Sequence, residues 1–298
     1  MSLNIPDHYT ISFSTNVTLL LQQKGSKLRG TVTEGTYTGK QASPVDQIGR
    51  VEMSQVTSRF ADISYTDASV DRRWVVPTDW DLAQRIDTFD KLRLLTDPES
   101  SYTQNAVYAA GRKMDTLIIQ ANQATAKTGE QGATSTSFTA GNEVDVAVGG
   151  SNSRLNVAKL LELKEKMMAN FVDFDEDEIY VGITAKDNSS LLNEIQIISS
   201  DFNGGDKPVL KDGRVDTFLG FRFKHCELIE TVASGTNEVT LPAWCKSGMH
   251  LGIWNDVQTD ISQLKTKKGL PWQSYVMMTI GATRLEENKV YAVESYRA

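Results

Sequence analysis

The clearest pattern of apolar and polar positions lies in the middle of the chain, where apolar residues recur at offsets of three and four. That spacing is typical of one face of an α-helix. The pattern follows Asp97-Pro98-Glu99, which combines an N-capping side chain, a proline suited to the first helical position and an acid near the positive end of the helix dipole. We therefore predict a helix over residues 98–126, about 40 Å long. Its buried stripe would consist of Val107, Ala110, Met114, Leu117, Ile118 and Ala121.

Residues 31–76 show a different pattern, in which β-branched and aromatic residues alternate with polar ones between glycines and a proline. This favours a long β-hairpin or an extended β arm. Thr, Ser, Gln, Asp and Arg dominate the segment, so we expect both of its faces to be polar, with few large apolar side chains. A two-stranded ribbon of this kind is marginal in isolation, so a neighbouring subunit is expected to cover it. The candidate contact residues are Arg50, Arg59, Arg72, Arg73 and Trp74. Ion pairs of the four arginines would mainly fix the register of the contact.

The remainder of the chain mixes helices and strands. A Gly-, Ser- and Thr-rich loop with a short hairpin is expected over 127–153, and a helix over 154–169 with Asn152 or Ser153 as its cap. A buried strand over 178–184 and a short helix over 186–198 should follow. Further strands are predicted at 218–223, 251–254, 257–261, 274–280 and 289–293. This order predicts an α+β fold.

Composition narrows the function classes. The chain has 298 residues, of which 40% are hydrophobic, so it can bury a core without disulfides or metals. Its net charge is −7, and residues 170–206 alone hold nine acids and one base, a sum of −8. The rest therefore sums to +1, and without a basic tail we expect no direct neutralisation of nucleic acid. Neither a signal peptide nor a membrane-spanning segment is predicted.

Candidate chemistry is sparse. Cys226 and Cys245 do not form a CxxC pair, and we interpret both as reduced, buried residues. Asp173-x-Asp175-x-Asp177 begins like a calcium loop, but its sixth position is not glycine and its twelfth cannot chelate. His225 next to Cys226 would point to the opposite face of a strand. We therefore predict no catalytic residue, cofactor or metal site, and a protein that is not an enzyme.

Several strings, in their order along the chain, resemble the major capsid proteins of tailed double-stranded DNA bacteriophages. They are Leu19–Ser26, Gly39–Asp46, Val70–Trp74, Ile86–Asp97, Ala110–Asp115 and Gly213–Phe221. The resemblance implies the Hong Kong 97-like phage capsid fold. Residues 1–30 would form an N-terminal arm, 31–76 an extended β loop, 77–153 a peripheral domain with a long spine helix, 154–262 an axial domain, and 263–298 return strands of the peripheral domain.

The same resemblance implies a structural role in the virion. Copies of the chain would self-assemble as pentamers and hexamers into an icosahedral capsid that encloses double-stranded DNA without sequence-specific contact. Assembly would take place in the bacterial cytoplasm with portal and separate scaffolding proteins, and a decoration protein is a further candidate partner. The alternatives are an encapsulin-type nanocompartment shell, a phage tail or tube subunit, and, less favoured, a hydrolase.

Overall fold

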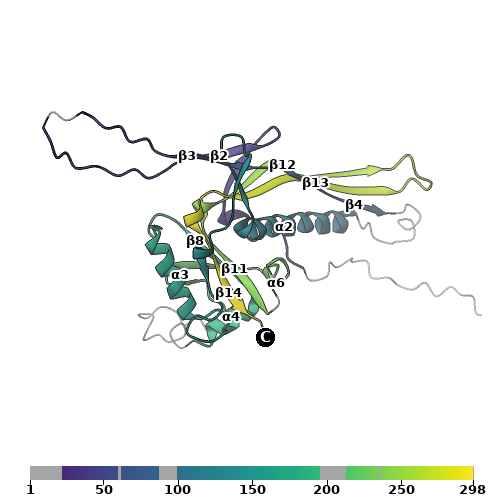
Figure 1. Ribbon diagram of the computed structural model, residues 1–298. Helices are drawn as coiled ribbons and strands as arrows, with labels where there is room; N and C mark the ends of the chain where they lie inside the picture. The colour runs from purple at the N-terminus through teal and green to yellow at the C-terminus, as the bar shows by residue number, and fades with distance from the viewer. Residues whose placement is uncertain are drawn as a thin grey trace, which may run out of the picture.

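The computed structural model describes residues 22–59, 62–86, 99–194, 213–233, 235 and 237–297. Their strands form three sheets around one long helix, with shorter helices at one end of the molecule (Figure 1). The predicted α+β class is therefore confirmed. No helix among these residues is long and apolar enough to cross a membrane.

The first sheet has four strands in the order β1-β12-β13-β4. Its strands are β1 (Thr33–Thr36), β4 (Thr78–Ile86), β12 (Met249–Gln263) and β13 (Trp272–Arg284). β12 and β13 form a long antiparallel hairpin that extends beyond the body of the molecule, and β1 joins β12 in parallel (Figure 1). The separate strands predicted around 251–261 are thus one strand, β12.

The second sheet has six strands in the order β7-β14-β11-β8-β10-β9. Its strands are β7 (Glu143–Val144), β8 (Ile179–Ile183), β9 (Thr217–Phe218), β10 (Phe221–His225), β11 (Glu238–Cys245) and β14 (Val290–Tyr296). All five residues of β8 are buried, as its apolar run predicted. Helices α3 (Val157–Ala169), α4 (Ala185–Leu192) and the single turn α6 (Ile229–Val232) accompany this sheet. α3 is capped by Asn156, which accepts from the Lys159 N–H at 2.9 Å, and not by the two residues expected from sequence.

The third sheet is small, with the order β2-β3-β5-β6. It pairs the hairpin of β2 (Ala42–Ile48) and β3 (Val70–Val75) with the short hairpin of β5 (Ala126–Thr128) and β6 (Thr134–Thr136). The short hairpin predicted within 127–153 is therefore present.

The long helix α2 runs from Glu99 to Gln123, which confirms the predicted helix; Asp97 and Pro98 lie outside the described residues. Of the expected stripe, Ala110, Met114, Ile118 and Ala121 are buried, while Val107 and Leu117 are half-buried. Ile119 is also buried, because α2 contacts β13 and β12 on one side and β11 and β14 on another. A helix packed between two sheets buries a wider surface than one stripe.

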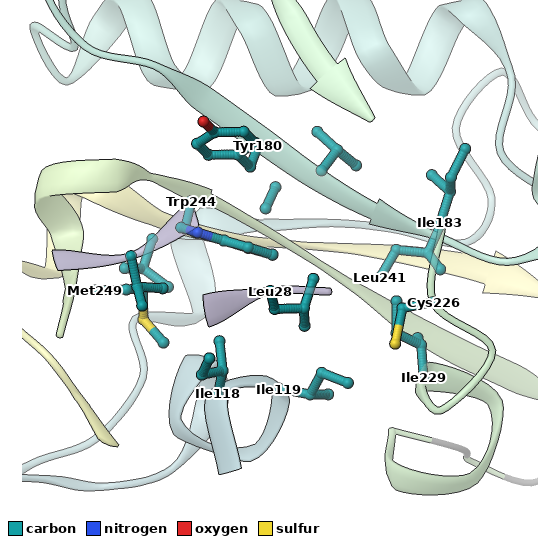
Figure 2. Close-up of a cluster of buried hydrophobic side chains, with 14 of the residues drawn as sticks. Leu28, Ile118, Ile119, Tyr180, Ile183, Cys226, Ile229, Leu241, Trp244 and Met249 are labelled. Carbon is teal, nitrogen blue, oxygen red and sulfur yellow. The ribbon is translucent and has the colours of Figure 1, made fainter. Parts of the chain in front are cut away.

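The main core lies between α2 and the six-stranded sheet (Figure 2). Ile118 and Ile119 of the helix face Leu28 of the N-terminal segment, together with Trp244 and Leu241 of β11. Fully burying one such side chain contributes about 1.5–3 kcal/mol. The described N-terminal residues around Leu28 are therefore part of the core.

The chain crosses between the two large sheets in a way that differs from the predicted boundaries. It leaves the six-stranded sheet through a 3-10 turn at Lys246–Gly248, enters β12, and returns through Glu287–Lys289 into β14. β12 thus lies outside the unit predicted for 154–262, and β14 does not join the sheet predicted for the return strands. Val290–Val293 is an uninterrupted buried apolar run, which suits a strand covered on both faces.

Candidate functional site

The most prominent surface feature is the loop between β2 and β3, which projects far from the rest of the molecule (Figure 1). Its base is an antiparallel pair in which Asp46 is opposite Arg72 and Ile48 is opposite Val70, with a register shift between Ala42 and Val45. The Gly49 N–H donates to the Ser69 carbonyl oxygen at 2.6 Å, which extends the pairing by one step. Beyond it, the described residues of the loop form no strand. We call residues 49–69 the loop tip.

The loop is shorter than the predicted 31–76 segment. Thr33–Thr36 is strand β1 of the four-stranded sheet, and the Tyr37 N–H donates to the Ile253 carbonyl oxygen at 2.9 Å. These residues belong to the body because their backbone groups pair with β12.

The loop also carries more apolar surface than its composition suggested. Seven large apolar side chains on it are each at least 55% exposed: Ile48, Val51, Met53, Val56, Ile63, Tyr65 and Val70. The expectation that both faces are polar is therefore wrong. A run of exposed apolar side chains on a projecting segment is a typical feature of a contact surface.

A buried charge network ties the base of this loop to the end of α2. Arg73 of β3 is 5% exposed, and its Nη1 lies 3.2 Å from Oε1 of Glu287. The other oxygen of Glu287 accepts from Nε of Arg284 at 3.0 Å. Arg284 is fully buried and also donates to the carbonyl oxygens of Asn122 and Ala124 at the C-terminal end of α2. Breaking such a network by removing one partner typically costs about 3–5 kcal/mol, because a buried charge is left unpaired.

The predicted contact residues fall into an exposed group and a buried one. Arg50 and Arg59 are exposed on the loop tip, and the Arg50 guanidinium lies 5.6 Å from the centroid of the exposed Phe171 ring. Arg72 forms an ion pair with Asp46 at 2.5 Å across the hairpin. Arg73 is buried within its own chain and is not available to a partner, which corrects that assignment.

Trp74 is half-buried, and its Nε1–H donates to the Gly129 carbonyl oxygen at 2.7 Å. Its ring lies against Gly132, where an added Cβ would come within 3.1 Å of it. The indole therefore holds the β5–β6 hairpin against β3, and only its remaining exposed part could contact another molecule.

An apolar groove lies elsewhere on the molecule, where α2 meets β4 and β13. Its volume is about 240 Å³, and its lining includes Leu82, Ala106, Ala109 and Met277. The Lys113 ammonium covers one wall, 3.6 Å from the centroid of the Trp80 ring. In Figure 1, α2 and β4 extend to the opposite side from the loop tip, so the loop of one chain points away from its own groove.

The groups that could support catalysis are structural instead. Cys226 and Cys245 are buried free thiols, and burial raises their pKa values to about 11 and about 12, far from a reactive thiolate. Burial lowers the pKa of His250 to about 4, and its ring nitrogens lie 2.9 Å from the hydroxyl oxygens of Thr33 and Tyr37. Within the described residues, no group of three or more His, Cys, Asp and Glu side chains could hold a metal.

Sequence reasoning did not identify the buried charges Asp115 and Arg284 or the half-buried Glu287. Asp115 and Arg284 are fully buried, and apart from Glu287, which lies three residues from Arg284, the partners named above lie far away in sequence. A charged residue within an apolar helix pattern is a weak signal, and it does not identify the partner.

Comparisons with known proteins agree with this geometry. A family described as "Phage capsid protein" matches residues 5–296. No curated protein matches the chain. Among solved structures, the capsid of cyanophage P-SCSP1u is similar with 15% identity and a TM-score of 0.75, over 98% of this chain and 94% of that chain.

Two further structures show the same likeness. The capsid asymmetric unit of cyanophage Pam1 aligns with 10% identity and a TM-score of 0.76, over 100% of this chain and 99% of that one. The head structure of Helicobacter pylori bacteriophage KHP40 aligns with 10% identity and a TM-score of 0.71, over 99% of this chain and 98% of that one. At these identities the likeness shows a common fold over the whole chain.

Proposed function

Because the chain belongs to the phage capsid protein family, we propose that it is the major shell subunit of a tailed phage and that its projecting loop carries a contact between subunits. It has the Hong Kong 97-like capsid fold, and its place is the virion capsid. The family is structural, which confirms the prediction that the protein is not an enzyme and decides against the hydrolase, tail and encapsulin alternatives.

The two large sheets correspond in this proposal to the two domains of the capsid fold. The four-stranded sheet with α2 would be the peripheral domain, and the six-stranded sheet with α3 and α4 the axial domain. Pentamers and hexamers of the chain would enclose the packaged DNA, assembled in the host cytoplasm with portal and scaffolding proteins. A decoration protein stays a candidate partner.

The observation that carries the proposal is the exposed apolar surface of the loop tip. If the pairing of Ile48 with Val70 and of Gly49 with Ser69 continues in register, Met53 lies opposite Tyr65. Opposed residues share a face, and alternate residues along a strand return to it. The tip would then be a ribbon with one mainly apolar face and one mainly polar face. The first would carry Val51, Met53, Gln55, Ile63, Tyr65 and Asp67, and the second Glu52, Ser54, Val56, Asp62, Ser64 and Thr66.

A second copy of the chain is the partner that fits this face. The groove between α2 and β4 offers apolar lining on the opposite side of the molecule, which the loop of the same chain does not approach. A contact between two different surfaces is heterologous, and repeated heterologous contacts close into rings when the rotation permits. Such rings are what a shell built from pentamers and hexamers requires.

The two faces of the ribbon allow a matched test. Met53→Asp with Tyr65→Asp places two charges on the apolar face, whereas Ser54→Asp with Thr66→Asp places the same charges on the polar face. We expect the first pair to prevent rings and shells and the second to preserve them, as seen by velocity sedimentation and negative-stain electron microscopy. Thermal melting should be similar for both, because all four side chains are exposed. Equal assembly by the two variants would refute the contact.

A further inference from the structure

The N-terminal segment Gln22–Thr31 crosses α2 at one point, where the helix carries Gly111 and Asp115. Residues four apart lie on the same face of a helix. An added Cβ at Gly111 would lie 2.5 Å from the carbonyl carbon of Gly25, so only glycine permits this backbone approach. The helix therefore has a place shaped for this segment.

Asp115 receives the segment through its carboxylate, which is fully buried. Its oxygens accept from the backbone N–H groups of Lys27 at 2.9 Å and Leu28 at 3.0 Å. They also accept from the Ser26 hydroxyl and the Gln23 side-chain amide, each at 2.5 Å. All of these donors come from one stretch of chain, so the carboxylate loses them together if that stretch leaves.

The same segment also contacts the rest of the fold. Nζ of Lys27 donates to the His225 carbonyl oxygen at 2.9 Å, and the Thr31 carbonyl oxygen accepts from Nε1–H of Trp244 at 3.0 Å, both in the six-stranded sheet. The chain then enters β1, which pairs with β12 of the four-stranded sheet. About ten residues thus join the helix and both large sheets.

We propose that Gly111 and Asp115 form a receptor for Gln22–Leu28, and that this segment is a latch holding α2 and the two sheets in one arrangement. Asp115 is a positioning residue in this role. A buried carboxylate that has lost its hydrogen-bond donors is costly unless water reaches it. The hydrogen bonds to Asp115 should therefore break together, and the segment should detach as a unit. Gln22–Leu28 lies within the segment predicted as the arm, and removing residues 1–21 breaks none of these contacts.

Hydrogen exchange followed by mass spectrometry on the full-length chain tests the latch. Asp115→Asn keeps the size of the side chain but turns one acceptor into a donor that faces other donors. We expect exchange in peptides covering 22–31 to rise about tenfold or more, with peptides from β8 and β14 unchanged. Asp260→Asn, at an exposed position of β12, is the matched control and should match the wild type. Wild-type protection of 22–31 in Asp115→Asn would overturn the proposal.

If Asp115→Asn fails to fold, a second variant tests the latch. Gln23→Ala with Ser26→Ala removes two donors from half-buried positions of the segment, and Lys24→Ala is an exposed control on the same segment. The double variant should lose protection over 22–31, and the control should keep it. Unchanged protection in the double variant would refute the receptor.

Truncation tests the latch at protein concentrations too low for assembly, so the result does not depend on the proposed shell function. A chain that begins at Arg29 should melt at a lower temperature than a chain that begins at Gln22, or fail to fold. Equal melting of the two truncated chains would overturn the latch.

Discussion

Replacing Val51–Ala68 of the loop tip by a Gly-Ser linker of about four residues should leave the subunit folded and prevent shell assembly. The described residues of this stretch are exposed almost throughout, so the replacement removes little buried apolar surface. It retains Arg50, the Gly49–Ser69 pair and the buried Arg73 network. The fold should therefore lose nothing that holds the loop base in place.

The expected change in stability is small and positive. Loop-closure entropy grows as (3/2)RT ln n, so shortening roughly 18 residues to about four stabilises the chain by about 1.3 kcal/mol. For a domain of this size, that corresponds to a rise in melting temperature of about 2–4 °C. Calorimetry or circular dichroism melting measures this, with the wild-type chain purified in parallel.

Assembly is measured on the same samples by velocity sedimentation and electron microscopy. The shortened chain should sediment as a monomer at concentrations where the wild type forms rings or shells. A fall in melting temperature of more than about 10 °C would show that the tip stabilises the core. Shells formed by the shortened chain would show that the contact between subunits lies elsewhere.

Three further predictions concern the body of the subunit. Ile118→Asp should lower the free energy of unfolding by several kcal/mol and abolish cooperative melting, because Ile118 is buried. Leu117→Asp, at a half-buried position, should lower it less, and equal losses of stability would contradict the observed burial. The pKa of the Glu294 carboxyl is raised from 4.5 to about 7, first by burial and then by the neighbouring Glu143. The contribution of Glu294 to stability is therefore complete below about pH 4.5 and is lost as the pH rises through about 7. Glu294→Gln should therefore flatten the loss of melting temperature between about pH 5 and about pH 8, and an unchanged pH profile would refute this cause. Replacing both buried cysteines by alanine should leave assembly intact with modest packing losses, and well-folded double mutant that fails to assemble would reveal thiol chemistry.

The elements that could be predicted from sequence are those whose signal is local. The helix α2 was predictable because its apolar residues repeat with the helical period over many turns, and β8 because four hydrophobic residues and one glycine form an uninterrupted run. The same holds for the short hairpin of β5 and β6. The membership in a capsid family came from the order of several strings along the whole chain, which no single periodicity contains.

Contacts between distant residues were decided only by the tertiary structure. Strand β14 has the same local pattern whichever sheet it joins, and its neighbours β7 and β11 determine its place. In the sequence, Arg73 has the pattern of a surface arginine, and only the fold places Glu287 beside it. The sequence likewise shows no partner for Asp115, because Lys27 and Leu28 reach it only in the folded chain. Periodicity reports which side of an element is apolar, but a buried charge is stabilised by partners whose approach depends on the whole fold.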